Sequence, residues 1–237
     1  MFSRLAAIFL FLPGLAWGFT FLTEGMKGWE KNEIRIYFNP ANCSIPEKEI
    51  ETAIDRAVNA WNSVPTADVK IHYEGRTTQT GTQEDPLIEC ATSGLDDSIA
   101  VTYVSTASGR IFTGYMQLNA EPSSLGNVEN YREDRLAIVI AHEMGHILGL
   151  GHSVTESALM YFSIGAKEHL ALGQDDVDGV TFLYPRKEPE DGLLGCGSLG
   201  APGTGGGGGL LGVLAFLGLF TWGLRFLPTP RPFASPA

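Results

Sequence analysis

The 237-residue chain is 44% hydrophobic and 18% charged, which is enough apolar material for a folded core and excludes a wholly disordered protein. Its 27 aspartate and glutamate residues outnumber its 16 lysine and arginine residues, giving a formal net charge of −11. Because an acidic body repels a phosphate backbone, the composition also excludes nucleic acid as a partner.

The first 18 residues have the layout of a secretory signal peptide. One basic residue, Arg4, precedes an apolar run over residues 5–12, and Ala16 and Gly18 are small residues at the two positions that a signal peptidase reads. The apolar run is too short to cross a hydrocarbon core of about 30 Å. We therefore expect residues 1–18 to direct export and Phe19 to be the mature N-terminus; an uncleaved anchor or a buried helix is the alternative.

Between residues 19 and 187 the hydrophobic pattern predicts one domain of mixed strands and helices. Alternating apolar and polar residues indicate strands, and an apolar stripe from Ile50 to Trp61 indicates a helix that begins behind the capping-box spacing of Ser44 and Glu47. The remaining predicted elements are strands at 33–38, 69–73, 99–104 and 111–118, a loop at 75–97, a largely apolar helix at 132–148, an irregular connection at 153–173 and a last helix at 175–184.

Two cysteines lie in this domain. Cys43 and Cys90 would both be exported, and an oxidising compartment permits a disulfide between them. Cys196 lies beyond the domain and is left over. We expect the Cys43–Cys90 pair, with two buried free thiols as the alternative.

The helix predicted at 132–148 contains the sequence His142-Glu143-Met144-Gly145-His146. Two histidines four residues apart project from one helix face and present two neutral nitrogens to a tetrahedral metal. Glu143 lies beside them, where it can take a proton from water on the metal. A turn at Gly149 can return His152 as a third ligand, which completes the metzincin form of the zinc motif, His-Glu-x-x-His-x-x-Gly-x-x-His. The sequence therefore predicts one catalytic Zn²⁺, with Glu143 as the catalytic residue.

A methionine follows the motif at a characteristic distance. Met160 lies eight residues after His152, within Ser157-Ala158-Leu159-Met160-Tyr161. In metzincins a methionine turn forms an apolar floor beneath the zinc histidines, and Met160 matches that position. A core methionine with no relation to the metal is the alternative.

These residues resemble the matrixins, the matrix-metalloprotease branch of the metzincins, over roughly residues 19–185. Beyond the zinc motif, the match rests on Ser153, on the turn around Met160 and on Gln174-Asp175-Asp176-Val177-Asp178-Gly179. The resemblance implies an α/β catalytic domain of the α+β type: a mixed twisted sheet with an antiparallel edge strand, an active-site helix, a methionine turn and a C-terminal helix. It also implies endopeptidase activity on protein or peptide substrates.

The resemblance implies how a substrate would bind. The substrate would lie extended along the edge strand, which we place at residues 112–119. The loop at 161–172, with Tyr161 and Phe162, would wall the pocket for the side chain just after the cleaved bond.

The resemblance also implies a role for the new N-terminus. In matrixins an ammonium group freed by processing can pair with an aspartate of the last helix. Signal cleavage would free the ammonium of Phe19, within reach of Asp175 or Asp176. We expect the domain to act as a monomer.

Other metal sites of the family match this sequence poorly. The second, structural zinc of many matrixins is held by three histidines and an aspartate, whereas only His72 and His169 lie outside the motif here. We therefore expect that site to be missing. Calcium, if bound, would use Asp96 or Asp97.

The end of the chain resembles bacterial C-terminal sorting tails. Residues 188–209 form a Gly/Pro-rich linker that includes Gly195-Cys196-Gly197, and residues 210–237 contain an apolar segment followed by Arg225 and Arg231. We expect this tail to contact the membrane, as a sorting tail or a plain anchor, with the body outside the cell or at its envelope.

A second class of function competes with proteolysis. A zinc-bearing binding or adhesion module at the cell surface would fit the exported body and the tail equally well. Glu143 separates the two readings, because binding alone needs no base beside the metal. A lytic or self-processing enzyme would share the protease's chemistry and differ in its substrate.

Overall fold

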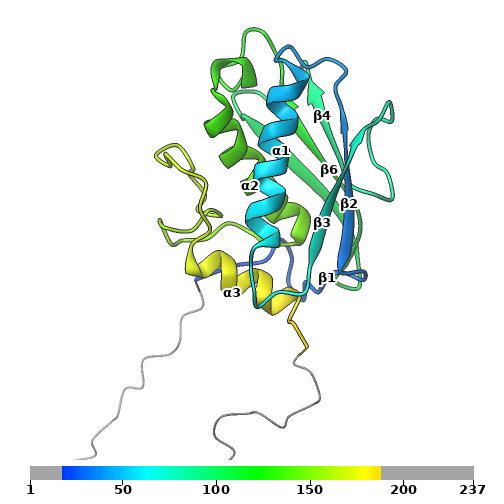
Figure 1. The fold of residues 1–237 in the computed structure, drawn as a ribbon, viewed down its shortest axis with the longest axis vertical. Helices are drawn as coiled ribbons and strands as arrows, with labels where there is room; N and C mark the ends of the chain where they lie inside the picture. The colour runs from blue at the N-terminus through cyan, green and yellow to red at the C-terminus, as the bar shows by residue number, and fades with distance from the viewer. Residues whose placement is uncertain (1–17, 188–237) are drawn as a thin grey trace, which may run out of the picture. The chain divides into compact units, whose positions relative to one another are not determined.

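The structure, a computed structural model, describes residues 18–187 (Figure 1). Residues 1–17 of the predicted signal peptide, the linker with Cys196 and the hydrophobic tail lie outside the described residues. Within residues 18–187, no helix has both the length and the apolar character needed to cross a membrane.

A six-stranded sheet forms one layer of the domain. Strands β3, β2, β4 and β6 lie side by side in that order and run parallel, β5 pairs antiparallel with β6, and β1 pairs with the first two residues of β6. The strands are β1 (Gly28–Trp29), β2 (Glu33–Asn39), β3 (Lys70–Arg76), β4 (Leu87–Ala91), β5 (Ala100–Ala107) and β6 (Arg110–Asn119). The mixed α/β fold with an antiparallel edge strand is thereby confirmed.

The position predicted for the edge strand is wrong. Residues 112–119 lie in β6, which has β4 on one side and β5 on the other, so the antiparallel edge strand is β5. The error has a physical cause. One face of β6 is covered by helices while Tyr115 and Gln117 on the other face are only partly buried, so this interior strand alternates in the way a half-exposed strand does.

Strand β4 lies inside the segment predicted to be a loop. It is only five residues long, so an alternation of apolar and polar residues does not reveal it. It also directly follows a largely polar stretch that ends at Pro86. Ile88 and Cys90 are nevertheless buried, because β4 fills the space between β2 and β6.

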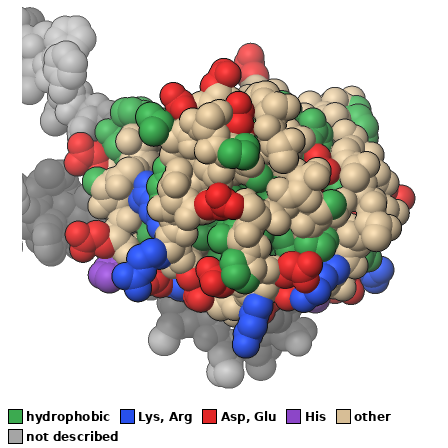
Figure 2. Space-filling view, turned by 90° about the horizontal axis from the view of Figure 1, so that it is seen from above, with side chains coloured by type: hydrophobic (Ala, Val, Ile, Leu, Met, Phe, Trp, Pro, Cys, Tyr) green, Lys and Arg blue, Asp and Glu red, His purple; other side chains and the backbone are tan. Residues whose placement is uncertain are grey.

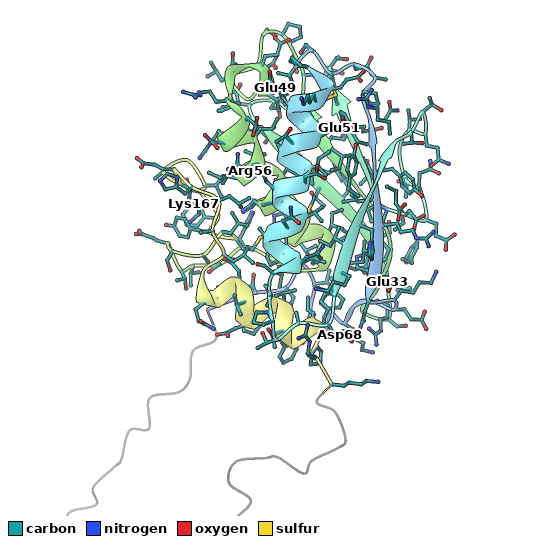
Figure 3. All side chains as sticks on the ribbon, in the orientation of Figure 1. Glu33, Glu49, Glu51, Arg56, Asp68 and Lys167 are labelled. Carbon is teal, nitrogen blue, oxygen red and sulfur yellow. A yellow bond between two sulfur atoms is a disulfide. The ribbon has the colours of Figure 1, made fainter. Side chains whose placement is uncertain are left out.

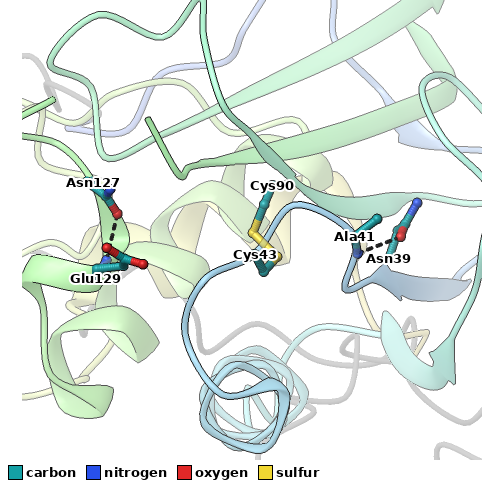
Figure 4. The surroundings of a disulfide bond; sticks show 6 residues. All are labelled: Asn39, Ala41, Cys43, Cys90, Asn127 and Glu129. Atoms are coloured by element: carbon teal, nitrogen blue, oxygen red, sulfur yellow. Dashed lines mark hydrogen bonds between the residues drawn. A yellow bond between two sulfur atoms is a disulfide. The ribbon is translucent and has the colours of Figure 1, made fainter. Parts of the chain in front are cut away.

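A disulfide joins β4 to the loop that follows β2. Cys43 and Cys90 are bonded, with a Cα–Cα distance of 5.2 Å (Figure 4). Beside it, the Asn39 side-chain oxygen accepts from the Ala41 amide at 2.9 Å, which shapes the turn that leads to Cys43. The bond ties the loop before α1 (Glu47–Asn62) to the middle of the sheet.

Two helices cover one face of the sheet, α1 over β3 and α2 (Glu133–Leu148) over β5 and β6 (Figure 1). The apolar stripe of α1 is buried as its spacing predicts, and Trp61 Nε1 donates to the Ala141 carbonyl of α2 at 2.8 Å. The predicted capping box is wrong: Pro46 holds the N-cap position, and no side chain caps the helix.

The last helix, α3 (Gln174–Leu183), closes the end of the domain, and a short 3-10 turn, η1 (Val128–Asn130), precedes α2. After α3, the Tyr184 hydroxyl donates to the Leu148 carbonyl at 2.8 Å and accepts from the Trp29 amide at 3.0 Å. One buried side chain therefore connects the end of α2 to β1, which fixes α2 relative to the sheet.

Acidic side chains are spread across the face shown in Figure 2, in keeping with the net charge of −11. Some pair with arginines across elements: Glu51 of α1 accepts from Arg76 Nε of β3 at 3.0 Å, and Arg56 Nη1 of α1 donates to Asp134 at 2.7 Å. Figure 3 labels Glu51 and Arg56 on α1. Exposed pairs of this kind contribute about 0–1 kcal/mol each, so the buried core is what holds the fold together.

Candidate metal centre

Helix α2 is the central element of the candidate site. Every residue of α2 from Leu136 to Leu148 is buried, including His142, Glu143 and His146. Polar side chains in such surroundings need partners, because an unpaired buried polar group costs about 1–3 kcal/mol. The partners of the histidines are therefore the first thing to identify.

A left-handed residue ends α2 and turns the chain back. Gly149 has a φ of 104°, which favours glycine, and its amide donates to the His146 carbonyl at 2.9 Å. The N-terminal segment braces this turn, since the Gly151 amide donates to the Thr20 carbonyl at 2.8 Å and Thr20 Oγ1 donates to the His152 carbonyl at 2.7 Å. The turn brings His152 beside the helix, where the motif spacing predicts it.

The three histidines converge, with one nitrogen of each lying within 4.8 Å of the others. Their ring centroids are 4.9 Å apart for His142 and His146, 4.8 Å for His146 and His152, and 5.3 Å for His142 and His152. His142 Nδ1 lies 2.8 Å from the Leu159 carbonyl oxygen, and His146 Nδ1 lies 2.8 Å from that of Leu150. Because a carbonyl only accepts, each Nδ1 carries a hydrogen, and the lone pair on Nε2 is left for a metal.

Burial keeps these imidazoles neutral near pH 7. It lowers the pKa of His142 to about 4, with the neighbouring charge of His146 adding to the effect, and it also lowers the pKa of His146 and of His152. Neutral imidazole is the form that binds metal. Three such nitrogens fit a zinc ion that is tetrahedral with one position open.

Glu143 lies beside the histidine group and is 8% exposed. Burial raises the pKa of its carboxyl group, which makes it a stronger base than an exposed glutamate. Thr102 of the edge strand β5 donates through Oγ1 to the Glu143 carbonyl at 3.2 Å. This bond ties β5 to the helix at the level of the candidate site.

Met160 lies directly beneath the helix. It is 2% exposed, and a Cβ atom added to Gly145 would overlap its sulfur, so only glycine at position 145 allows this close approach. The Met160 carbonyl accepts from the Ser153 amide at 2.7 Å, which joins the methionine turn to the segment after His152. Met160 therefore lies against α2 at Gly145, one residue before His146.

One aspartate holds the methionine turn in place. Asp176 of α3 is 1% exposed and accepts from three amides: its Oδ1 from Met160 at 2.9 Å, and its Oδ2 from Leu159 and, at 2.7 Å, from Gly173. Because Leu159 also supplies the carbonyl that orients His142, Asp176 acts on the candidate site through that turn. Sequence reasoning missed this role; the signal was a pair of adjacent aspartates at the start of a helix.

The neighbouring carboxylate, Asp175, has a different environment. Its Oδ2 is buried and, among the described residues, is the one buried side-chain oxygen without a hydrogen-bond partner. Gly18 lies against it, because a Cβ atom there would overlap Asp175 Oδ1. Of the two aspartates expected to meet the ammonium of Phe19, Asp176 is already engaged, and Asp175 has the free oxygen.

Tyr161 and Phe162, predicted to line a substrate pocket, line a cavity of about 570 Å³ together with Glu156 and Lys167. Their ring centroids are 4.4 Å apart, and Phe162 is 63% exposed. The three histidines are not among the residues that line this cavity.

The two remaining histidines and the two candidate calcium ligands do not belong to this group. His72 lies on β3, and His169 lies in the loop between Met160 and α3. The Asp97 carboxylate accepts from the Leu125 amide at 3.3 Å, and Asp96 contributes only its backbone carbonyl to the bonds around Asn119 and Ser124. Over residues 18–187, neither aspartate joins a cluster of three or more ligating side chains.

Comparison with known proteins agrees with the geometry. A model of the matrixin family matches residues 28–185. The chain is 29% identical to stromelysin-1 of Rattus norvegicus over 175 residues, covering 70% of this chain and 35% of that protein, and 30% identical to matrix metalloproteinase-20 of Homo sapiens over 174 residues, covering 70% and 34%. It is 28% identical to the interstitial collagenase of Equus caballus over 175 residues, covering 71% and 35%. The chain therefore spans about a third of the length of these relatives. A family match over most of the described domain, together with the converging histidines, shows that this chain belongs to the matrixin family.

Proposed function

We propose that this chain is a zinc-dependent endopeptidase that is exported and hydrolyses peptide bonds in protein or peptide substrates. The observation that carries the proposal is the convergence of three neutral histidines beside Glu143. Glu143 is a buried glutamate of α2, and the domain that contains it belongs to the matrixin family. Binding alone would explain the histidines but gives no reason to bury a carboxylate beside them.

In this proposal His142, His146 and His152 hold the zinc. The metal would polarise the scissile carbonyl and lower the pKa of a water molecule. Glu143 would accept a proton from the attacking water and return it to the leaving amine. The carbonyls of Leu159 and Leu150 keep the first two imidazoles in the orientation that this chemistry needs.

The structure supports an extended mode of substrate binding along β5. Among the described strands β5 pairs only with β6, so its other edge presents free backbone groups. A substrate strand could add to that edge by main-chain hydrogen bonds. The loop at 161–172 would then wall the pocket for the side chain after the cleaved bond.

A cleavage assay tests the proposal. The full chain is incubated with a pool of peptides of mixed sequence, and the products are identified by mass spectrometry. We expect cuts inside the peptides that stop when a zinc chelator is added. Stoichiometric zinc without a single cut would instead support a surface binding module.

We also propose that export sets the activity through the new N-terminus. Removal of residues 1–18 would place the ammonium of Phe19 near the unpartnered Oδ2 of Asp175. A buried ion pair there would hold residues 19–21, which brace the turn that carries His152. We therefore expect a protein that begins at Phe19 to be several-fold more active than one that begins at Gly18 or Thr20, measured as kcat/KM on one peptide. Equal activity of the three would contradict the pairing.

The proposal also assigns a role to each end of the chain. Residues 1–18 would direct export, and residues 210–237 would contact the membrane as a sorting tail or anchor. The catalytic domain would then act as a monomer outside the cell or at its envelope.

A further inference from the structure

Arg135 of α2 fastens the loop at 161–172 to the helix that carries the histidines. Its Nη1 atom donates to the carbonyl oxygens of Ile164 and Lys167, the latter at 3.2 Å. The side chain is half-buried, and among residues 18–187 it belongs to none of the ion pairs. The guanidinium is therefore engaged by loop carbonyls and by no carboxylate.

The position of Arg135 on α2 links it to the candidate site. Arg135 precedes His142 by seven residues, which is two helical turns or about 10.5 Å, so both side chains leave the same side of the helix. His142 bonds the Leu159 carbonyl just before the loop, and Arg135 bonds the loop four and seven positions beyond Met160. One side of α2 thus holds the loop at its beginning and in its middle.

The loop has few other constraints. It contains no helix or strand, and a turn closes it where the Lys167 amide donates to the Ile164 carbonyl at 3.1 Å. Lys167 Nζ, labelled in Figure 3, donates to the Glu156 carbonyl at 2.9 Å. Packing of the half-buried Ile164, Leu170 and Leu172 against the core adds apolar contacts. Because Arg135 bonds both ends of the 164–167 turn, it supplies the hydrogen bonds from this turn to α2, beside the apolar packing of Ile164.

We propose that Arg135 is a positioning residue that fixes the 164–167 turn and thereby sets the depth of the pocket for the side chain after the cleaved bond. Since Arg135 touches neither the histidines nor Glu143, it acts on substrate choice through the loop. This inference rests on the proposed peptidase function, and its test is designed to separate the two.

The test compares three variants of the full chain with the wild type. Arg135→Met keeps the aliphatic stem and removes the donors, while Arg135→Lys keeps a charge and one donor group. Arg56→Met is the matched control, because Arg56 contacts the first turn of α2 through Glu133 and Asp134 and has no bond to the loop. Values of kcat/KM are measured on peptides that differ only in the residue after the scissile bond, and hydrogen exchange is measured on residues 161–172.

We expect Arg135→Met to lower kcat/KM about tenfold for the preferred residue, mainly through KM, and to leave poor substrates nearly unchanged, so that selectivity flattens. Exchange over 161–172 should quicken in this variant but not in Arg56→Met, and Arg135→Lys should recover part of both effects. Zinc content should stay constant throughout.

Two results would overturn the inference. One is a selectivity profile in Arg135→Met that matches the wild type. The other is an equal loss on every peptide with no change in loop exchange, which would indicate a general loss of stability. If the wild type cleaves nothing, the peptidase proposal fails, and loop exchange alone still decides whether Arg135 holds the turn.

Discussion

Replacing Glu143 with alanine should abolish nearly all peptide cleavage while leaving the zinc in place. The carboxylate is the proposed proton acceptor, and positioned acid–base groups contribute about 10²–10⁴ in rate, so we expect kcat to fall by roughly a thousandfold. Glu143 does not belong to the group of three histidines that would hold the metal, so the zinc content should remain at the wild-type level. Initial rates on one peptide and zinc per chain by elemental analysis measure the two effects.

The control for this variant is Glu133→Ala. Glu133 lies in the first turn of the same helix and is only partly buried, so the substitution also removes a carboxylate from α2 but leaves the histidine group untouched. Its rate should stay within a few-fold of the wild type. Cleavage by Glu143→Ala at the wild-type rate would remove the proposed role of Glu143.

Replacing Asp176 with asparagine should cause the largest loss of stability of any conservative change near the site. Its carboxylate accepts from three backbone amides in a buried position, and an asparagine would turn its side-chain amide NH2, a donor, toward at least one of them. Since a charge-assisted bond is stronger than a neutral one and a buried donor without a partner costs about 1–3 kcal/mol, we expect a loss of about 3 kcal/mol. Thermal or urea unfolding of the full chain would measure it.

Asp178→Asn is the matched control for that change. Asp178 lies on the same helix but is exposed, and it accepts only from Gln174 Nε2, at 2.8 Å. Surface changes of this kind stay within about 0.5 kcal/mol. Equal stability of the two variants would contradict the account of Asp176 as the residue that holds the methionine turn.

Much of the fold could be predicted because its strongest signals are local. The stripe on α1 and the apolar length of α2 follow from helical periodicity, and both helices lie where the pattern indicates. The order of the sheet could not be read in the same way. Strand β6 is an interior strand because β4 pairs with it, and β5 is therefore left at the edge. Strand β4 has only five residues, and its sequence resembles a loop, so the sequence does not reveal this pairing.

Part of the candidate site could be predicted from the sequence, and part of it could not. The positions of the three histidines and Glu143 are fixed by the spacing within one helix and one turn, so the sequence predicts which side chains converge. The groups that hold them, Asp176 and Thr20, come from elements far away in the chain and act through backbone hydrogen bonds. Such bonds leave no spacing pattern in the sequence. The adjacent aspartates at the start of α3 are a local signal, but they do not show which amides they meet.

A zinc titration tests the central claim most directly. The full chain is stripped of metal with a chelator, zinc is added back in fractions of an equivalent, and the cleavage rate of one peptide is measured at each step. The account predicts that the rate rises in proportion to bound zinc and reaches its plateau at one zinc per chain. Cleavage by the metal-free chain, or a chain loaded with one zinc that cuts no peptide, would contradict it.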